Sequence, residues 1–198
     1  MTRIGVFGGT FDPPHLGHLL AATDAAEQLE LDMLWFVPNA TQPLKGAGQG
    51  SPTDRLEMVR RLVGPDPRLG VDALEIERDG LSFTVDTMSV FADRFPDATR
   101  FLLIGADVTA TFGQWRDPRR IRKLAAIVIM ERPGTDLGPS SATLMDPGGY
   151  LSGAPRLPTR RIEISSTEVR ARVRSGKSIR GFVPDAVAEY IAAAGLYR

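Results

Sequence analysis

Short apolar segments alternate along this chain with segments whose apolar residues recur every three or four positions. Arg3–Phe7, Met33–Val37, Phe101–Ile104 and Ala125–Met130 have the length and the apolar content of buried strands, and helical patterns lie between them. Such alternation favours a parallel sheet, because a helical crossover returns the chain to the end of the sheet at which the previous strand began. We therefore predict an α/β fold with a mainly parallel sheet.

We expect a Rossmann-like, doubly wound arrangement with helices on both faces of that sheet. The expected helices are Gly17–Leu29, one starting near Ser51, Thr84–Phe95, Pro118–Lys123, one from Ser165 through Val173, and Pro184–Ala194. Serine is a favoured N-cap, and Ser51 is followed by Pro52, which suits the first helical position. Ser165 has a glutamate three residues later, which is capping-box spacing.

Three further segments complete the predicted organisation. Leu69–Glu77 is predicted to form one or two short strands, and Arg161–Ile164 the last strand. Gly134–Pro158, with several Gly, Pro and Ser residues, is predicted to be a flexible excursion. We expect one domain over residues 1–198, with a helical C-terminal part over about 165–198, because this length suits a single core.

Composition excludes several classes of protein. The absence of cysteine excludes a disulfide scaffold, a thiol nucleophile, a zinc–thiolate site and an iron–sulfur cluster. The 24 basic and 24 acidic residues balance, so no general attraction to nucleic acid or membrane is expected. No apolar run is long enough to span a membrane, and the first residues do not resemble a secretory signal, so the expected location is the cytoplasm.

Charge is nevertheless uneven along the chain. Between Arg156 and Arg180, eight basic residues stand against two acidic ones. This excess fits a site for a small polyanion, and it also fits a solvated helix face. Both interpretations stay open at this point.

The most unusual turn follows the first predicted strand. In parallel sheets, ligands bind beyond the carboxyl ends of the strands, which points to the turns after Phe7, Ile104 and Ile164. The first of these turns holds both histidines of the chain, His15 and His18, at the start of a helix. Free N–H groups at a helix start attract anions, and two imidazoles can donate to phosphate oxygens. A single loop histidine is often only an exposed side chain, whereas this pair favours a phosphate site.

The common nucleotide-binding motifs are missing. Gly176-Lys177-Ser178 resembles the end of a Walker loop, but alanine occupies the position of the first glycine. The glycines between residues 46 and 50 do not have dinucleotide-binding spacing either. We therefore exclude a P-loop enzyme and a nicotinamide dehydrogenase.

Two motifs, in Gly8–His18 and in Ile164–Arg170, together resemble the paired signatures of the nucleotidyltransferase superfamily. Within it, the opening Gly-Gly-x-Phe-Asp-Pro-x-His-x-Gly-His is similar to that of the bacterial nicotinate mononucleotide adenylyltransferase family. The further matches are Asn39 with Pro43 and Lys45, Ser82-Phe83-Thr84, Ile104-Gly105-Ala106-Asp107, Trp115, and Gly195-Leu196-Tyr197. The resemblance covers nearly the whole chain. Phe83, where tyrosine is commoner, and Arg116 depart from the pattern.

The resemblance implies attack by the phosphate of nicotinate mononucleotide on the α-phosphorus of ATP, which gives the dinucleotide and pyrophosphate. This chemistry needs positioning and charge neutralisation rather than a nucleophilic side chain. The implied catalytic residues are His15, His18 and Arg170. The implied ATP-binding residues are Gly8, Gly9, Thr10, Phe11, His15, His18, Ser165, Ser166, Thr167 and Arg170. The implied substrate-binding residues are Asn39, Lys45, Thr84, Gly105, Asp107 and Trp115, to which Arg116 is added as the neighbour of the tryptophan.

Each role at the substrate end has a structural alternative. Trp115 is implied to stack on the pyridine ring, and the alternative is a core tryptophan. Thr84 is implied to bind the nicotinate carboxylate and Asp107 the ribose hydroxyls, whereas either residue would also suit a helix N-cap. Mg²⁺ is implied because ATP carries it, held mainly by phosphates and water with no dedicated protein site. Asp12 and Asp107 are candidates for contact with this ion through water.

Other functions share some of these features. Pantetheine-phosphate adenylyltransferase and the cytidylyltransferases have the two core motifs but lack the Phe-Asp-Pro-x-His opening. A regulatory nucleotide-binding module without turnover would have no need of the His15, His18 and Arg170 set. A nucleic-acid-binding role would rest on the basic segment alone. The expected partners are therefore the small molecules ATP and nicotinate mononucleotide, without nucleic acid or membrane, and the oligomeric state, including a homo-oligomer, stays open.

Overall fold

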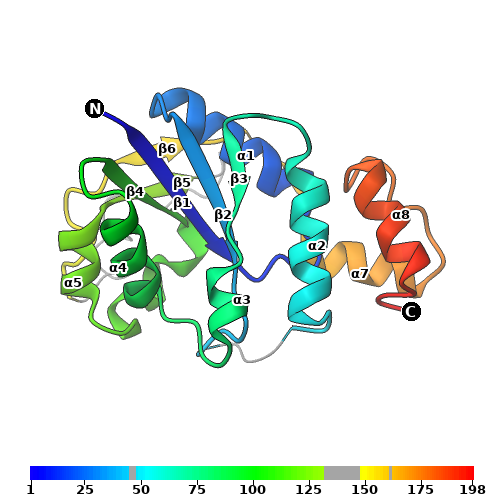
Figure 1. Ribbon diagram of the computed structural model, residues 1–198. Helices are drawn as coiled ribbons and strands as arrows, with labels where there is room; N and C mark the ends of the chain where they lie inside the picture. Colours follow the sequence, from blue (N-terminus) through cyan, green and yellow to red (C-terminus); the bar gives the residue numbers. More distant parts are fainter. Residues whose placement is uncertain (45–47, 132–147, 161) are drawn as a thin grey trace.

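A six-stranded parallel sheet forms the centre of the computed structural model, which describes residues 1–44, 48–131, 148–160 and 162–198 (Figure 1). The strands are β1 (Arg3–Gly9), β2 (Met33–Pro38), β3 (Leu69–Val71), β4 (Thr99–Gly105), β5 (Ala126–Glu131) and β6 (Arg156–Pro158). Their order in the sheet is β3-β2-β1-β4-β5-β6, and each neighbouring pair is parallel. The strand order reverses between β1 and β4, so a crevice is expected at their carboxyl ends.

Helices cover both faces of the sheet, as predicted. They are α1 (Leu16–Gln28), α2 (Pro52–Val63), α3 (Leu74–Arg78), α4 (Thr84–Arg94), the 3-10 helix η1 (Ala106–Gln114), α5 (Pro118–Leu124), α7 (Ser166–Arg174) and α8 (Asp185–Ala193). In Figure 1, α4 and α5 lie together on the left, whereas α7 and α8 lie beyond α2 on the right. The C-terminal helices therefore extend the layer formed by α1 and α2.

Alternation along the strands divides the buried side chains into two cores. In β4, Leu103 packs with the α1, α2, α7 and α8 side chains, whereas Leu102 packs with those of α4, α5 and η1. This follows from the two-residue period of a strand, which sends successive side chains to opposite faces. Continuous apolar runs such as Phe101–Ile104 are thus explained by burial on both sides.

Both predicted serine caps are confirmed. Ser51 accepts a hydrogen bond from the N–H of Asp54 at 3.1 Å, and α2 starts at Pro52. Ser165 accepts from the N–H of Glu168, also at 3.1 Å, and α7 starts one residue later. Each oxygen satisfies one of the N–H groups that a helix start leaves without a partner.

The prediction of strand throughout Leu69–Glu77 is wrong in its second half. Leu69–Val71 forms β3, but Leu74–Arg78 forms the short helix α3. The Asp72 carboxylate accepts a hydrogen bond from the N–H of Leu74 at 3.0 Å, which stabilises the helix start. Leu, Glu and Arg in this segment are also good helix formers.

The last strand lies earlier than predicted. Arg156–Pro158, assigned from the sequence to a flexible excursion, forms β6 and places Leu157 opposite Met130 of β5. A proline is tolerated here because an edge strand needs no N–H on its outer side. Residues 162–164 are not a strand. Just before them, the backbone N–H of Arg160 donates to Asp24 of α1 at 2.9 Å, which joins this part of the chain to a helix.

The rest of the predicted excursion falls partly outside the described residues, since positions 132–147 are not among them. The helix η1 was not predicted; Gly113 and two β-branched threonines weaken its helical pattern. Among the described residues, none of the helices is long and apolar enough to cross a membrane.

Candidate functional site

A cavity of about 930 Å³ opens at the carboxyl ends of β1 and β4. It is lined by 16 of the residues singled out from the sequence: Gly8, Gly9, Thr10, Phe11, His15, His18, Asn39, Thr84, Gly105, Asp107, Trp115, Arg116, Ser165, Ser166, Thr167 and Arg170. Lys45, also singled out, lies outside the described residues. We call the part around His15, His18 and Arg170 the histidine end, and the part around Thr84, Asp107 and Trp115 the tryptophan end.

The turn after β1 has an unusual backbone. Phe11 has a positive φ of 51°, and the peptide bond between Asp12 and Pro13 is cis. A Cβ atom at Gly9 would lie 2.8 Å from the Phe11 ring, closer than side chains tolerate, so glycine is required there. The buried Phe11 ring, 3% exposed, supports the base of the turn.

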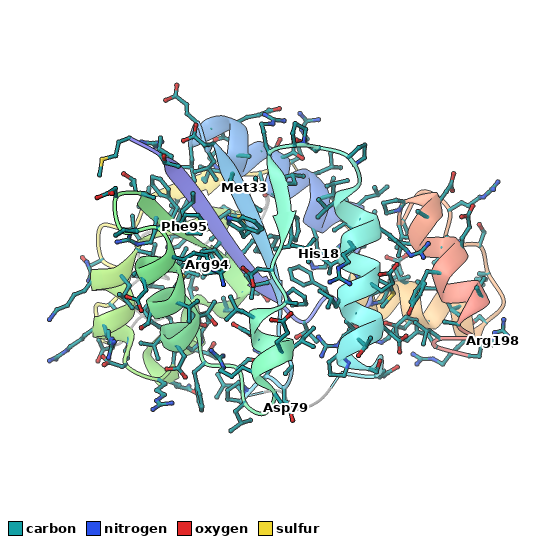
Figure 2. The ribbon with its side chains drawn as sticks, viewed as in Figure 1. His18, Met33, Asp79, Arg94, Phe95 and Arg198 are labelled. Atoms are coloured by element: carbon teal, nitrogen blue, oxygen red, sulfur yellow. The ribbon has the colours of Figure 1, made fainter. Side chains whose placement is uncertain are left out.

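His15 and His18 lie face to face where α1 begins. Their ring centroids are 3.7 Å apart with an interplanar angle of 29°. His15 is the N-cap residue and is 2% exposed, while His18, labelled in Figure 2, lies one turn later against Phe7 at the end of β1. The pair therefore presents two imidazoles to the cavity beside a helix N-terminus, which favours anions.

A backbone hydrogen bond determines which nitrogen of His18 carries the proton. The N–H of His15 donates to Nδ1 of His18 at 3.2 Å. In a neutral imidazole an accepting Nδ1 leaves the proton on Nε2. Nε2 of His18 is therefore a donor, which is the property needed to bind a phosphate oxygen.

The start of α7 is joined directly to the first turn. The Ser166 hydroxyl donates to the Pro13 carbonyl at 2.8 Å, and the Arg170 guanidinium donates through Nη1 to the Asp12 carbonyl at 2.6 Å. The Nε of Arg170 is buried without a hydrogen-bond partner among the described residues. Such an orphaned donor is costly unless an acceptor binds there, so its position in the cavity wall favours an anionic ligand.

A buried polar network under the first turn was missed from the sequence. Arg55 of α2 is fully buried and donates to the carbonyls of Thr10, Ala40 and Gly50 and, at 3.4 Å, to Oδ1 of Asn39. Burial lowers the pKa of Arg55, an effect that the nearby Asp12 opposes. The sequence held a signal, because Arg55 shares the helical spacing of the apolar residues Met58, Val59 and Leu62.

Asn39, expected among the substrate-binding residues, lies at the histidine end. Its amide Nδ2 donates to the hydroxyl of Thr10 at 3.2 Å, and its own backbone N–H donates to the Gly9 carbonyl at 3.0 Å. These bonds join the ends of β1 and β2. Asn39 thus supports the backbone of the first turn in addition to lining the cavity.

The tryptophan end is held mainly by ring contacts. Trp115 is half-buried, with its ring centroid 5.0 Å from that of Phe112. The exposed Arg116 lies over the Phe83 ring, 4.9 Å from its centroid, and pairs with Asp86 at 3.5 Å. One side of Trp115 thus packs on the protein while the residue lines the cavity, so the core alternative for this tryptophan accounts for only part of its surroundings.

The cap alternatives for Thr84 and Asp107 are not what the structure shows. Phe83 is the N-cap of α4 and Gly105 that of η1, and neither Thr84 nor Asp107 occupies a cap position. Both residues line the cavity in the first turn of their helices. Their side chains are thus available for roles other than capping.

Comparisons with known proteins agree on one family. Residues 6–172 match the family model described as cytidylyltransferase-like. The chain is 51% identical to a Gemmatimonas aurantiaca protein named "Probable nicotinate-nucleotide adenylyltransferase", over 99% of this chain and 92% of that one. The chain belongs to the nicotinate-nucleotide adenylyltransferase family. A Salinibacter ruber protein of the same name is 39% identical over 98% of this chain and 97% of its own.

The adenylyltransferase fold is also found in solved structures. A Plasmodium falciparum nicotinic acid mononucleotide adenylyltransferase, complexed with NaAD, superposes with a TM-score of 0.77 at 18% identity, over 100% of this chain and 98% of that one. At this identity the match bears on the fold alone. It confirms the Rossmann-like α/β architecture predicted from the alternation of strands and helices.

The carboxylates near the cavity do not form a dedicated metal site among the described residues. The described residues contain no group of three His, Cys, Asp or Glu side chains that could hold one. Asp12, a candidate for contact through water, has its carboxylate bound to three protein donors. Glu75 accepts from the hydroxyl of Thr87, whereas Asp107 is exposed in the cavity wall. Asp107 therefore fits a water-mediated contact better than Asp12 does.

Proposed function

We propose that this chain transfers the AMP moiety of ATP to nicotinate mononucleotide, giving nicotinate adenine dinucleotide and pyrophosphate as a step in NAD biosynthesis. An oxygen of the mononucleotide phosphate forms a bond to the α-phosphorus of ATP, and the bond from that phosphorus to the bridging oxygen of pyrophosphate breaks. The observation that carries this proposal is that one cavity holds both motifs, joined by the Ser166–Pro13 and Arg170–Asp12 hydrogen bonds. Two relatives named "Probable nicotinate-nucleotide adenylyltransferase", which this chain matches over 92% and 97% of their length, support the choice of substrates.

At the histidine end the residues bind and neutralise the triphosphate. His18 donates through Nε2 to an oxygen of the α-phosphate, where negative charge shifts as the bond to pyrophosphate breaks. Arg170 donates through Nε, and the N–H groups at the start of α7 bind further phosphate oxygens. His15 binds the phosphates beside His18. Gly8, Gly9, Thr10 and Phe11 form the backbone wall along the nucleotide.

At the tryptophan end the residues orient the second substrate. Trp115 stacks on the pyridine ring, Thr84 and neighbouring N–H groups bind the nicotinate carboxylate, and Asp107 binds ribose hydroxyls. Gly105 leaves room for Asp107, since a Cβ atom there would lie 2.4 Å from the Asp107 Oδ1. Arg116 adds positive charge beside the carboxylate. Asn39 and Lys45 complete the set of substrate-binding residues.

Mg²⁺, when bound with ATP, supplies charge neutralisation on the phosphates. The protein contributes the cavity, in whose wall the exposed carboxylate of Asp107 would take part through water. We also propose that residues 1–198 act as one catalytic domain, because α7 in the C-terminal part supplies Arg170 to the cavity. The cytoplasm stays the proposed location, since the proposed substrate ATP is supplied there.

The test is pyrophosphate release with Mg-ATP and, in parallel, nicotinate mononucleotide, nicotinamide mononucleotide or phosphopantetheine. We expect fast release with the nicotinate compound. Equal rates with both pyridine nucleotides would retain the reaction and remove the selectivity assigned to Thr84 and Arg116. Release with phosphopantetheine alone would overturn the assignment of the tryptophan end.

A further inference from the structure

The Asp12 carboxylate is a buried junction between segments that are far apart in the sequence. It is 6% exposed and accepts three hydrogen bonds. Oδ2 accepts from the N–H of Gln49 at 2.7 Å, and Oδ1 accepts from the N–H of Gly50 at 2.9 Å and from the hydroxyl of Tyr197 at 2.7 Å. Hydrogen bonds to a carboxylate are stronger than neutral ones, so these three restrain Asp12 closely.

Gly50 is held from two sides at this junction. Its N–H donates to Asp12, and its carbonyl accepts from Nε of the buried Arg55 at 3.2 Å. A Cβ atom at position 50 would lie 2.9 Å from the Tyr197 hydroxyl oxygen and 3.0 Å from Oδ1 of Asp12. The absence of a side chain therefore permits the Asp12–Tyr197 contact.

Tyr197 reaches this junction from the end of the C-terminal part. The residue is 9% exposed and has a positive φ of 61°. Burial is the main cause that raises the pKa of Tyr197 well above its ordinary value, and the hydrogen bond to Asp12 adds to the rise. The hydroxyl accordingly stays protonated and remains a donor under ordinary conditions.

The junction is bonded directly to groups proposed to bind ATP, whereas it reaches Asn39, proposed to bind the second substrate, through Arg55. The Asp12 carbonyl accepts from Arg170, and the carbonyl of the next residue accepts from Ser166. Gln49 lines the cavity, and its side chain accepts from Arg174 of α7 at 3.3 Å. A shift of Asp12 would therefore displace Arg170 and the first turn together.

We propose that Tyr197 is a positioning residue for ATP, acting through the Asp12 carboxylate to hold the first turn, residues 48–50 and Arg170 in register. This inference rests on the proposed function for the identity of the nucleotide. Tyr197 itself does not line the cavity, so the proposed role is indirect. The C-terminal part thereby contributes to ATP binding through Tyr197 as well as through α7.

The chain offers a matched control for the test. Tyr190 of α8 also donates its hydroxyl to an aspartate, Oδ1 of Asp54, at 2.8 Å. Tyr197→Phe and Tyr190→Phe each remove one such hydroxyl and nothing else. Only the first acts on a residue of the first turn, and its bond is buried whereas that of Tyr190 is partly buried, so thermal unfolding of both variants measures any loss of stability apart from a positioning effect.

For Tyr197→Phe we expect the KM for ATP to rise about tenfold, the size of one hydrogen bond to a charged group. The KM for nicotinate mononucleotide and kcat should stay within about twofold. Tyr190→Phe should leave both KM values within about twofold. Equal changes in both KM values, or an unchanged KM for ATP in Tyr197→Phe, would overturn the proposal.

A double-mutant cycle tests whether Tyr197 acts through Asp12. Asp12→Ala removes the acceptor of all three hydrogen bonds, so its effect on the KM for ATP should exceed that of Tyr197→Phe. The double variant should then be no worse than Asp12→Ala alone. Additive effects would refute the path through Asp12.

The failure of this inference can be separated from the failure of the proposed function. Direct titration of wild type and Tyr197→Phe with Mg-ATP, measured by calorimetry, requires no second substrate. A wild type that binds Mg-ATP without forming product with nicotinate mononucleotide would overturn the proposed function alone. Equal Kd values for Mg-ATP in the two proteins would overturn the positioning role alone.

Discussion

At the histidine end of the cavity, hydrogen bonds join β1, α2, residues 48–50 and the C-terminal helices, and those made by Asp12 and Arg55 are buried or partly buried. Asp12 and Arg55 are at the centre of this network. At the tryptophan end, Arg116 makes an exposed ion pair and lies over one ring, and Trp115 packs on Phe112. Catalysis gains most from donors that are already in place where charge develops, whereas substrate selection tolerates groups that adjust.

The largest effect should come from the group nearest the reacting phosphorus. His18→Ala removes a donor without emptying the core, so we expect kcat to fall about 10²- to 10³-fold while the protein stays folded. His18→Gln, which keeps a side-chain N–H, should recover part of the loss. Steady-state kinetics measure the turnover of the two variants, and thermal unfolding shows whether they stay folded. Turnover within about threefold of wild type in His18→Ala would remove this residue from the mechanism.

The second effect concerns the link between the two motifs. Arg170→Ala removes the buried Nε and the bond to the Asp12 carbonyl, so kcat/KM for ATP should fall about 10- to 100-fold. The matched control is Arg174→Ala, one turn along α7, where an exposed arginine donates to the Gln49 side chain at 3.3 Å. Its effect should stay below about threefold. Similar losses in the two variants would show that general charge, rather than position, matters at this end.

The third effect should come from the buried carboxyl group of Glu75 at the tryptophan end. Glu75 lines the cavity and is 7% exposed, and its burial raises the pKa of its carboxyl despite hydrogen bonds from Thr87 and Ser82 and the nearby charge of Arg78. Asp86 adds to the rise. Above the unfolded-state value, native Glu75 keeps a proton that the unfolded chain has lost, so stability falls as pH rises toward the native pKa.

Glu75→Gln removes this titration. We expect the free energy of unfolding of wild type, relative to the variant, to fall as pH rises from about 4.5, by at most about 1.4 kcal/mol per pH unit for one proton. Urea unfolding of both proteins from acid to neutral pH measures the difference. A difference that does not change with pH would mean that Glu75 ionises in the native protein as readily as in the unfolded chain.

The smallest effect should come from Arg116, because it is exposed and already paired with Asp86. Arg116→Ala should lower the preference for nicotinate over nicotinamide mononucleotide by less than about fivefold. Arg119→Ala, also exposed but outside the cavity wall, serves as the control. An unchanged preference would remove Arg116 from substrate selection and leave Thr84 and its neighbouring N–H groups as the basis of selectivity.

Much of the fold and of the cavity could be predicted because the relevant signals are local. The strand β1, the caps Ser51 and Ser165, and the paired histidines each follow from residues a few positions apart. The location of the last strand was predicted wrongly, because local sequence preference there competes with the pairing of strands in the sheet. Arg156–Pro158 lies in the sheet while residues 162–164 do not, because the edge of β5 and the Asp24–Arg160 contact decide the path.

By itself the sequence determined the alternation of strands and helices, the helix starts and the glycine- and histidine-rich turn, since each depends on backbone geometry and on side chains within about one helical turn. Only the tertiary structure decided that Asp12 meets Tyr197, 185 positions away, and that Arg55 is buried beneath the first turn. Helical spacing marks Arg55 as an inward-facing residue, but the partners in such long-range contacts leave no periodic pattern. These contacts form because packing the helices against the sheet buries polar groups, which must then find partners wherever the chain supplies them.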